Sequence, residues 1–414
     1  MSTDRKLGIQ DKLNLLVKGT THLPPPKPKS YYGIDSVVDG DFCRTPLGDA
    51  FFTEQVYLPD YRHGLSPILS PFPFSLISQW ANDPRLAEIP LSQFAFLDTE
   101  TSGLSGGTGT YAFMVGIARF VDHQLVLRQF FMRDPSEESA MLEAVARFLA
   151  PAQALVTFNG RAFDAPLLAT RYRLHHIPIP HQGYAHLDLL PLARRLWRDR
   201  LESRALKYLE QHILGMTRAS EEVPGYEIPF LYFDYLRSGD ARPLAGVFYH
   251  NAMDVVAMAA LLAHVNGVME DPYGGHVEHG LDFIALGKLF EDLGRWEEAA
   301  RLFERGLQSG VTEADFALAV KRLSILQKRR GDFNEAIRLW EEAAANGHIY
   351  AHIEIAKYYE HKCRDVKTAI QWTRSALDHL EHTDLPAYMR KHWLEEINHR
   401  LERLERKNSL RRPA

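Results

Sequence analysis

The C-terminal third of the chain carries one pattern three times. Each copy has a helix-periodic apolar segment, a turn, an aromatic residue or valine, a short polar pair, and an alanine that opens a second apolar segment. The three alanines, Ala299, Ala336 and Ala369, lie 37 and 33 residues apart. A short helix pair cannot bury its apolar face alone, so neighbouring copies must stack on one another. The pattern predicts an all-α domain over residues 278–400.

The period and the template resemble those of tetratricopeptide repeats, which are helix–turn–helix units of about 34 residues. The resemblance implies a stack of helix pairs whose concave surface docks a protein partner or steers a substrate. The alternative is an ordinary helical domain with chance internal similarity.

The rest of the chain needs further folded units, because 414 residues exceed one ordinary domain. Residues 1–30 end in HLPPPKPKS, which predicts a flexible proline-rich tail. Short alternating runs in residues 31–90 predict an N-terminal arm or hairpin region. Residues 401–414 are rich in arginine and predict a basic tail.

Strand and helix patterns alternate over residues 91–268. Three β-branched or aromatic runs, FAFLDTE, YAFMVGIARFV and QLVLRQFFM, follow one another with short connections, which suits an antiparallel meander. A helix pattern, the short strand QALVTFNG and further helix patterns come next. This order predicts an α/β domain with a mixed sheet, as expected of a ribonuclease H-like fold.

The first strand of this domain ends in two carboxylates. Asp98 and Glu100 are two residues apart, so they project from the same face of a strand. Two carboxylates so close repel each other unless a cation or a shared proton lies between them. Mg²⁺ and Mn²⁺ favour oxygen ligands of this kind. Taken alone, the pair also fits an exposed strand end with two solvated acids.

Two more acidic residues lie downstream. Asp164 opens a helix after the strand QALVTFNG, where it also fits a helix cap. Asp254 lies within an apolar helix, where an unpaired carboxylate is costly and needs a partner or a metal ion. His250 lies one turn before Asp254, on the same side of that helix.

Together these motifs resemble the DEDD superfamily of 3′→5′ exonucleases, and within it the YprB-like ribonuclease H-like group. The runs HLDLLPLARRLW, LKYLEQHILG and HNAMDVV are similar to segments of that group, some members of which also carry tetratricopeptide repeats. The resemblance covers roughly residues 90–268. It implies a ribonuclease H-like fold and a 3′→5′ exonuclease that hydrolyses the phosphodiester bonds of DNA or RNA.

The same resemblance assigns roles to residues of this chain. It implies a two-metal mechanism with Mg²⁺ or Mn²⁺ bound by four carboxylates, Asp98, Glu100, Asp164 and Asp254. A general base must also activate the attacking water. Family branches use either a tyrosine with three intervening residues before the last aspartate or a histidine with four. Here His250 has three and Tyr249 has four. We prefer His250, which aligns with the tyrosine position, and Tyr249 is the alternative.

Contacts to nucleic acid are expected from polar residues beside the acidic motifs and from cations of residues 161–207, where nine Lys and Arg accompany four Asp and Glu. At helical spacing such cations can follow a phosphate backbone, although a solvated helix face has the same pattern. The candidate contacts are Thr99, Thr101, Asn159, Arg161, Arg194, Arg195, Arg198 and Lys207.

Composition narrows the remaining choices. A net charge of −5 gives no global sign of nucleic-acid binding. Cys43 and Cys363 lack the spacing of a disulfide framework or a zinc site, which favours a reducing, cytoplasmic location. The apolar stretch LAGVFYHNAMDVVAMAALLAHV contains polar residues that argue against a membrane span. Two rival functions are a non-catalytic scaffold that binds nucleic acid or protein through its repeats, and a phosphatase acting on a small nucleotide.

Overall fold

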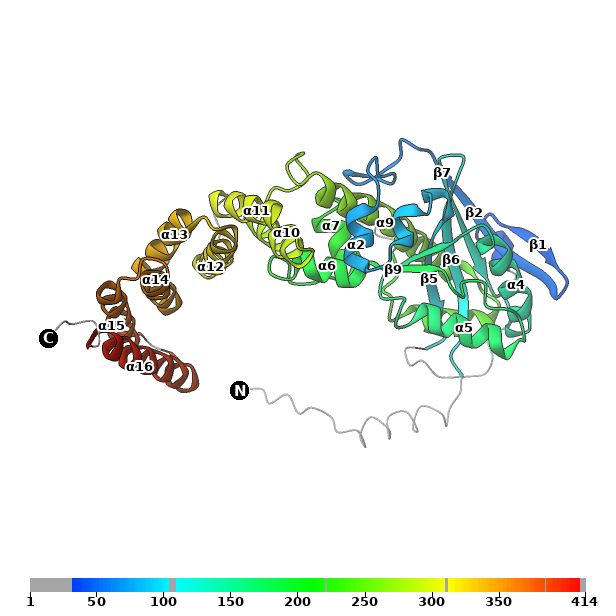
Figure 1. The fold of residues 1–414 in the computed structure, drawn as a ribbon. Coiled ribbons are helices and arrows are strands. Elements are labelled where there is room, and N and C mark those ends of the chain that lie inside the picture. The colour runs from blue at the N-terminus through cyan, green and yellow to red at the C-terminus, as the bar shows by residue number, and fades with distance from the viewer. Residues whose placement is uncertain (1–31, 104–108, 220–221, 310–311, 384, 410–414) are drawn as a thin grey trace, which may run out of the picture. The chain divides into compact units, whose positions relative to one another are not determined.

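The computed structural model describes residues 32–103, 109–219, 222–309, 312–383 and 385–409 (Figure 1). The expected tail at residues 1–30 and the last five residues of the expected basic tail lie outside these ranges. The chain divides into two compact units. The first holds the chain up to Pro191 together with Ala205–Asn266, and the second holds Leu192–Arg204 together with the chain from Gly267 onward.

A seven-stranded mixed sheet forms the centre of the first unit, which confirms the predicted fold class (Figure 1). Its order is β1-β2-β7-β6-β5-β8-β9. Neighbours from β1 to β5 pair antiparallel, whereas β8 pairs parallel with both β5 and β9. The strands are β1 (Asp41–Thr45), β2 (Gly48–Tyr57), β5 (Phe94–Thr101), β6 (Ala112–Val121), β7 (Gln124–Phe131), β8 (Ala154–Thr157) and β9 (Ala185–Asp188).

Two parts of this sheet differ from what the sequence patterns suggest. The hairpin β1–β2 comes from the expected arm region, and β2 extends the main sheet by pairing with β7. Strand β9 is only four residues long and was not predicted, because AHLD runs directly into a helix pattern. A separate two-stranded sheet joins β3 (Arg62–His63) to β4 (Ser66–Pro67).

Burial along β5 explains why acidic residues end this strand. Its first four residues, Phe94–Leu97, are buried, and its last four, Asp98–Thr101, are partly exposed. Nine of the ten residues of β6 are buried beside it, as expected for a strand covered on both faces. Strand β5 therefore runs from the core to the surface, and Asp98 and Glu100 lie in its partly exposed half.

Helices cover the sheet and connect its strands. Those of the first unit are α2 (Ser75–Ala81), α3 (Arg85–Glu88), α4 (Glu138–Leu149), α5 (Asp164–Leu174), α7 (Leu206–His212), α8 (Ile228–Ser238) and α9 (Ala245–Glu270), with α6 (Leu189–Trp197) beginning at its edge. Short 3₁₀ turns lie at Ile34–Ser36, Leu91–Gln93, Pro135–Glu137 and Arg242–Leu244.

Helix α9 is apolar on all sides because it is an interior helix. The helical stretch 242–270 is long and apolar enough to cross a membrane by length and composition, but 89% of its most apolar window is buried within the protein. Asn251 and Val255 of this helix lie against β6 at Gly116. This packing places the residues His250–Asp254 beside the end of β5.

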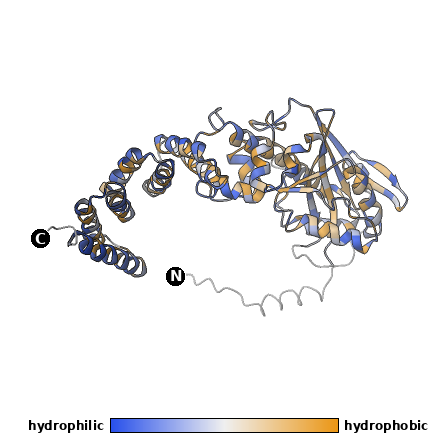
Figure 2. Cartoon of the chain, in the orientation of Figure 1, coloured by the Kyte–Doolittle hydropathy of each residue, from blue (hydrophilic) through white to orange (hydrophobic). Residues whose placement is uncertain are grey.

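The second unit is built from helices arranged as successive pairs, which confirms the predicted all-α fold. The helices are α10 (Gly280–Asp292), α11 (Trp296–Gln308), α12 (Glu313–Arg330), α13 (Phe333–Ala345), α14 (Ile349–His361), α15 (Val366–His382) and α16 (Ala387–Ser409). The anchor residues Ala299, Ala336 and Ala369 are all fully buried. Figure 2 shows mostly hydrophilic colours on α12 to α16, with the apolar residues confined to part of each helix.

Candidate metal centre

Asp98 and Glu100 lie opposite Gly116 and Met114 of β6 in an antiparallel pairing. Because side chains alternate along a strand, both carboxylates project from the same face of the sheet, as predicted. The register shifts between Glu100 and Thr101, at the end of the strand. Asp98 and Glu100 therefore lie at the end of β5, just before its pairing with β6 becomes irregular.

A relay of amide side chains fixes Asp98. Asn251 of α9 donates from Nδ2 to Asp98 Oδ2 at 2.9 Å. Gln129 of β7 in turn donates from Nε2 to Asn251 Oδ1 at 3.0 Å and to the carbonyl of Phe248 at 2.7 Å. Both amides are fully buried. Asn251 and Gln129 could not be identified from the sequence, since no local pattern reveals a hydrogen bond that joins a strand to a helix far along the chain.

Asp164 is the first residue of α5, and Thr99 holds it toward β5. The Thr99 hydroxyl donates to Asp164 Oδ1, a contact that crosses 65 residues of sequence. Thr99 was expected to contact nucleic acid, but here its side chain is engaged with a neighbouring carboxylate. The contact places Asp164 beside β5, and Asp164 lies near enough to Asp98 and Glu100 to repel both.

Asp188 organises the loop that precedes α5. Its Oδ1 accepts from the amides of Asn159 at 2.8 Å and Leu190 at 3.0 Å, and its Oδ2 accepts from the amide of Arg161 at 3.2 Å. Asn159 has a φ of 69°, a left-handed conformation that a non-glycine residue adopts only when its surroundings hold it there. Asp188 therefore stabilises the turn between β8 and α5 and also caps the start of α6.

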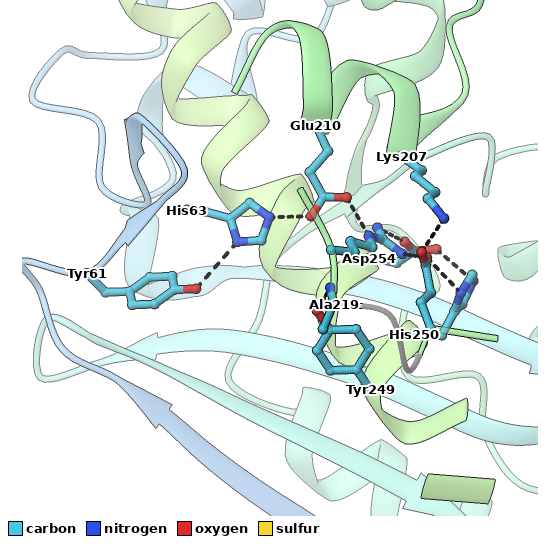
Figure 3. Close-up of polar contacts among 10 residues, drawn as sticks. Tyr61, His63, Lys207, Glu210, Ala219, Tyr249, His250 and Asp254 are labelled. Carbon is cyan, nitrogen blue, oxygen red and sulfur yellow. Dashed lines mark hydrogen bonds and ion pairs between the residues drawn. The ribbon is translucent and has the colours of Figure 1, made fainter. Parts of the chain in front are cut away.

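Asp254 has a buried partner, as its place on an apolar helix requires. Arg218, in the loop after α7, donates from Nη2 to Asp254 Oδ1. Its Nε donates to Glu210 Oε2 at 2.5 Å and its Nη1 donates to Glu222 Oε1 at 2.7 Å. Figure 3 shows the line of contacts, which continues from Glu210 to His63 Nε2 at 2.6 Å. Arg218 could not be identified from the sequence, because it lies in an irregular segment.

His250 and Tyr249, the two candidate bases, point to different neighbours (Figure 3). His250 Nε2 lies 3.5 Å from Asp254 Oδ2, and its Nδ1 lies 3.4 Å from Glu222 Oε1. The hydroxyl of Tyr249 accepts a hydrogen bond from the amide of Ala219 at 3.0 Å. The imidazole, rather than the phenol, therefore faces the acidic residues.

Charge in this region is unbalanced. We call Asp98, Glu100, Asp164 and Asp254 the carboxylate cluster. Burial raises the pKa of Asp98 well above its usual range, and repulsion from the other three carboxylates adds to the effect. Burial also raises the pKa of Glu100 to about 8, with further repulsion from Asp254 and Asp164 and an opposing effect of Arg218. Burial raises the pKa of Asp164 against the hydrogen bond from Thr99.

Partly buried carboxylates that repel one another suit a divalent cation, because Mg²⁺ and Mn²⁺ prefer oxygen ligands and supply the missing positive charge. The donor chemistry of the cluster therefore fits such an ion. Within the described part of the chain, however, no group of three or more His, Cys, Asp or Glu side chains is already arranged to hold one. The ion pair between Arg218 and Asp254 is one contact that would have to change.

The other expected nucleic-acid contacts are distributed over both units. Thr101 donates to the carbonyl of Gly103 at 2.9 Å. The guanidinium of Arg161 donates to the carbonyl of His186, and Lys207 pairs with Glu222. Three arginines belong to the segment Leu192–Arg204 of the second unit: Arg194 is exposed, Arg195 pairs with Asp292, and Arg198 lies 3.4 Å from Asp199.

Comparison with known proteins places the chain in a superfamily. Residues 95–266 match the RNase H superfamily, and residues 283–314 match the tetratricopeptide repeat. The protein YprB of Bacillus subtilis (strain 168) is 33% identical over 321 residues, which cover 76% of this chain and 75% of YprB. The family B DNA polymerase of the archaeon Pyrobaculum calidifontis is 15% identical with a TM-score of 0.32, over 50% of this chain and 30% of the polymerase. The chain therefore belongs to the RNase H superfamily, as a YprB-like protein with a nuclease fold followed by tetratricopeptide repeats.

Proposed function

We propose that this chain is a divalent-metal-dependent 3′→5′ exonuclease that hydrolyses phosphodiester bonds of DNA or RNA. The observation that carries the proposal is the carboxylate cluster, in which residues from β5, α5 and α9 bring like charges together at the end of β5. Repulsion between these carboxylates destabilises the fold unless a bound cation offsets it. Proteins of the RNase H superfamily are generally hydrolytic nucleases that use divalent metals. We therefore infer that the carboxylate cluster binds such metal ions.

In this proposal the four carboxylates of the cluster hold Mg²⁺ or Mn²⁺. Two such ions, when bound, stabilise the attacking and leaving oxygens of an in-line displacement at phosphorus. The chain's own contribution is orientation: Asn251 fixes the rotamer of Asp98, and Thr99 fixes that of Asp164. Partners of this kind set the direction of ligand oxygens and are as necessary as the ligands themselves.

His250 is the proposed general base. In the step, a water oxygen bonds to phosphorus, the bond from phosphorus to the 3′ oxygen breaks, and the imidazole takes the proton of the water. The leaving 3′ oxygen takes a proton from solvent, and a 5′-mononucleotide is released. His250 is favoured over Tyr249 because it lies beside Asp254, whereas the Tyr249 hydroxyl is engaged with the amide of Ala219.

The test uses DNA and RNA oligonucleotides labelled at the 5′ end, single- and double-stranded, with Mg²⁺, Mn²⁺ or EDTA. We expect a ladder that shortens from the 3′ end with metal and is absent with EDTA and in Asp98→Asn. His250→Ala should slow cleavage by about 10²-fold to 10⁴-fold, the usual contribution of a general base, and Tyr249→Phe should leave it nearly unchanged. Internal fragments would instead indicate an endonuclease, and no cleavage of any strand would contradict catalysis.

A cavity in the repeat unit supports a second candidate function, a scaffold that binds an acidic protein partner. The cavity measures about 760 Å³, the size of a typical ligand pocket. Two acidic residues, Glu354 and Glu396, accompany six cationic ones in its lining: Lys321, Lys328, Arg329, Lys357, Lys362 and Arg400. The excess of positive charge favours an anionic ligand.

Details of the lining favour an acidic peptide over stacked bases. Lys321 lies over the ring of Tyr350 at 5.1 Å and Lys362 over that of Phe333 at 4.7 Å, so cations already cover these ring faces. Buried polar atoms of Trp340 and Tyr350 have no hydrogen-bond partner among the described residues, so the polar contacts of a ligand must come mainly from the cations of the lining.

Selection from a displayed library of random peptides tests this binding role. We expect the intact chain to retain peptides rich in Asp and Glu, and Lys362→Glu to lose them. Lys391→Glu is the matched control, because Lys391 is exposed on α16 outside the cavity. Selection of neutral or basic peptides would contradict an acidic partner. Retention of single-stranded nucleic acid instead would make the cavity a substrate-binding surface.

A further inference from the structure

Arg218 is the centre of a buried ion network at the candidate metal centre. Its side chain is only 2% exposed, and each of its three donor groups contacts a different carboxylate. Two of these carboxylates, Glu210 and Glu222, lie outside the carboxylate cluster. The third is Asp254, so the network reaches into the cluster from the loop after α7.

Each oxygen of Asp254 has a nitrogen-bearing side chain as its neighbour in this arrangement. Arg218 contacts Oδ1, and His250 Nε2 lies 3.5 Å from Oδ2. An ion that uses Asp254 as a ligand must therefore displace one of these groups or share an oxygen with it. No described group of three or more potential ligands is already assembled while Arg218 is in place.

Arg218 has other anchors that do not depend on Asp254. Glu210 is fully buried, and His63, which is also fully buried, fixes its second oxygen at 2.6 Å (Figure 3). Glu222 is held from its other side by Lys207. The guanidinium can consequently stay on Glu210 and Glu222 when Asp254 leaves it.

We propose that Arg218 is a positioning residue that holds Asp254 in the metal-free protein and competes with a divalent ion for it. On binding of the ion, Asp254 turns from Arg218 to the ion, and Arg218 keeps its bonds to Glu210 and Glu222. This inference rests on the proposed role of Asp254 as a metal ligand. It adds that metal affinity is set by an internal cation and not by the carboxylates alone.

The sign of the effect separates competition from simple orientation. If Arg218 only oriented Asp254, its loss would weaken metal binding about 10-fold to 100-fold, as loss of an outer-shell partner usually does. In competition, loss of the guanidinium removes a positive charge that lies beside the ion in a poorly solvated site, so binding becomes tighter. Damage to the fold cannot mimic this gain.

The test measures Mn²⁺ binding to the intact chain, without nucleic acid, from the electron paramagnetic resonance signal of free Mn²⁺. We expect Arg218→Gln to bind Mn²⁺ at least about tenfold tighter than the wild type. Arg218→Lys keeps the charge and should stay within about threefold of it. Arg171→Gln is the matched control, because it removes one positive charge from another buried ion pair of the same unit, with Glu138.

The outcomes are distinct. Equal or weaker binding in Arg218→Gln, with binding intact in the wild type, overturns competition and leaves the proposed metal site standing. No Mn²⁺ binding by the wild type overturns both. If Arg218→Gln does not fold, the Nε–H resonance of Arg218 is followed in the wild type during a Mg²⁺ titration, after assignment by its loss in Arg218→Lys. A saturable shift supports competition, and an unchanged resonance while Mg²⁺ binds overturns it.

Discussion

Gly116 is the position where a single methyl group tests the architecture of the site. This residue of β6 pairs with Asp98 of β5. A Cβ atom at Gly116 would lie 2.1 Å from Asn251 Oδ1 and 3.0 Å from Val255 Cγ2. A contact of 2.1 Å essentially never occurs in folded proteins, so Gly116→Ala must push the side chain of Asn251 away from the sheet. The close approach of α9 to β6 therefore depends on glycine.

The cost follows from the contacts that Asn251 would lose. Its amide donates to Asp98 at 2.9 Å in a partly buried hydrogen bond and accepts from Gln129 at 3.0 Å in a buried one. Overpacking costs about 1–3 kcal/mol, and leaving a buried polar group without a partner costs about 1–3 kcal/mol. Alanine recovers about 0.5–1 kcal/mol of backbone entropy relative to glycine. We expect Gly116→Ala to lower the free energy of unfolding of the first unit by about 3 kcal/mol.

The assay is hydrogen exchange, read by mass spectrometry along a urea series, because peptides report each unit separately. Peptides from β6 and α9 should open at lower urea in Gly116→Ala, whereas peptides from α10 to α16 should not change. Gly109→Ala is the matched control, since a Cβ there meets no atom within 4 Å. If Gly116→Ala matches Gly109→Ala within about 0.5 kcal/mol, the reasoning about Asn251 and Asp98 is wrong.

Three further perturbations test the account. Asp98→Asn removes one of several carboxylates that repel one another, so without metal it should raise the free energy of unfolding by about 1–2 kcal/mol while abolishing cleavage. Urea unfolding and the oligonucleotide assay measure the two effects. In the repeat unit, burial opposes ionisation of Glu360, but the hydrogen bond and charge of Arg403 outweigh it and lower the pKa of Glu360 to about 2. The contribution of Glu360 to stability is therefore complete above pH 4.5, its ordinary pKa, and is lost as the pH falls from there toward 2. In this pH range the melting temperature of α14 and α16 should fall more steeply with decreasing pH in the wild type than in Glu360→Gln. Finally, the pH dependence of the cleavage rate should change in His250→Ala and persist in Tyr249→Phe, and the reverse result would assign the base to Tyr249.

Local periodicity was sufficient to predict much of the fold. The alternation of β5 placed Asp98 and Glu100 on one face, and the spacing of Ala299, Ala336 and Ala369 predicted repeated helix pairs, in which all three alanines are buried. Both patterns repeat within a few residues or at a fixed period, so a single sequence displays them. The fold class follows from such patterns because it depends mainly on which faces are apolar.

Partners that lie far apart in the sequence could not be predicted in this way. Arg218 joins residues 8, 4 and 36 positions away, and Asn251 reaches Asp98 across 153 positions. Neither residue belongs to a periodic pattern that predicts its contact. The four-residue strand β9 was missed for a related reason, since its pairing with β8, and not its own composition, makes it a strand.

The number of cations in a segment also did not predict which of them are free to contact phosphate. Arg195 and Lys207 were counted as cations for phosphate contact, but Arg195 pairs with Asp292 and Lys207 pairs with Glu222. Composition gives the number of charges in a segment and not their partners. Their role in nucleic-acid binding stays a prediction, which requires these ion pairs to open when the substrate binds.

The most direct test of the central claim is anomalous diffraction at the manganese edge from crystals of the chain soaked in MnCl₂. The account predicts anomalous peaks at the end of β5, within ligand distance of Asp98, Glu100, Asp164 and Asp254. It also predicts that Asp254 has turned from Arg218 toward the ion. Manganese bound only elsewhere on the chain, with the carboxylate cluster unchanged and Arg218 still on Asp254, would contradict it.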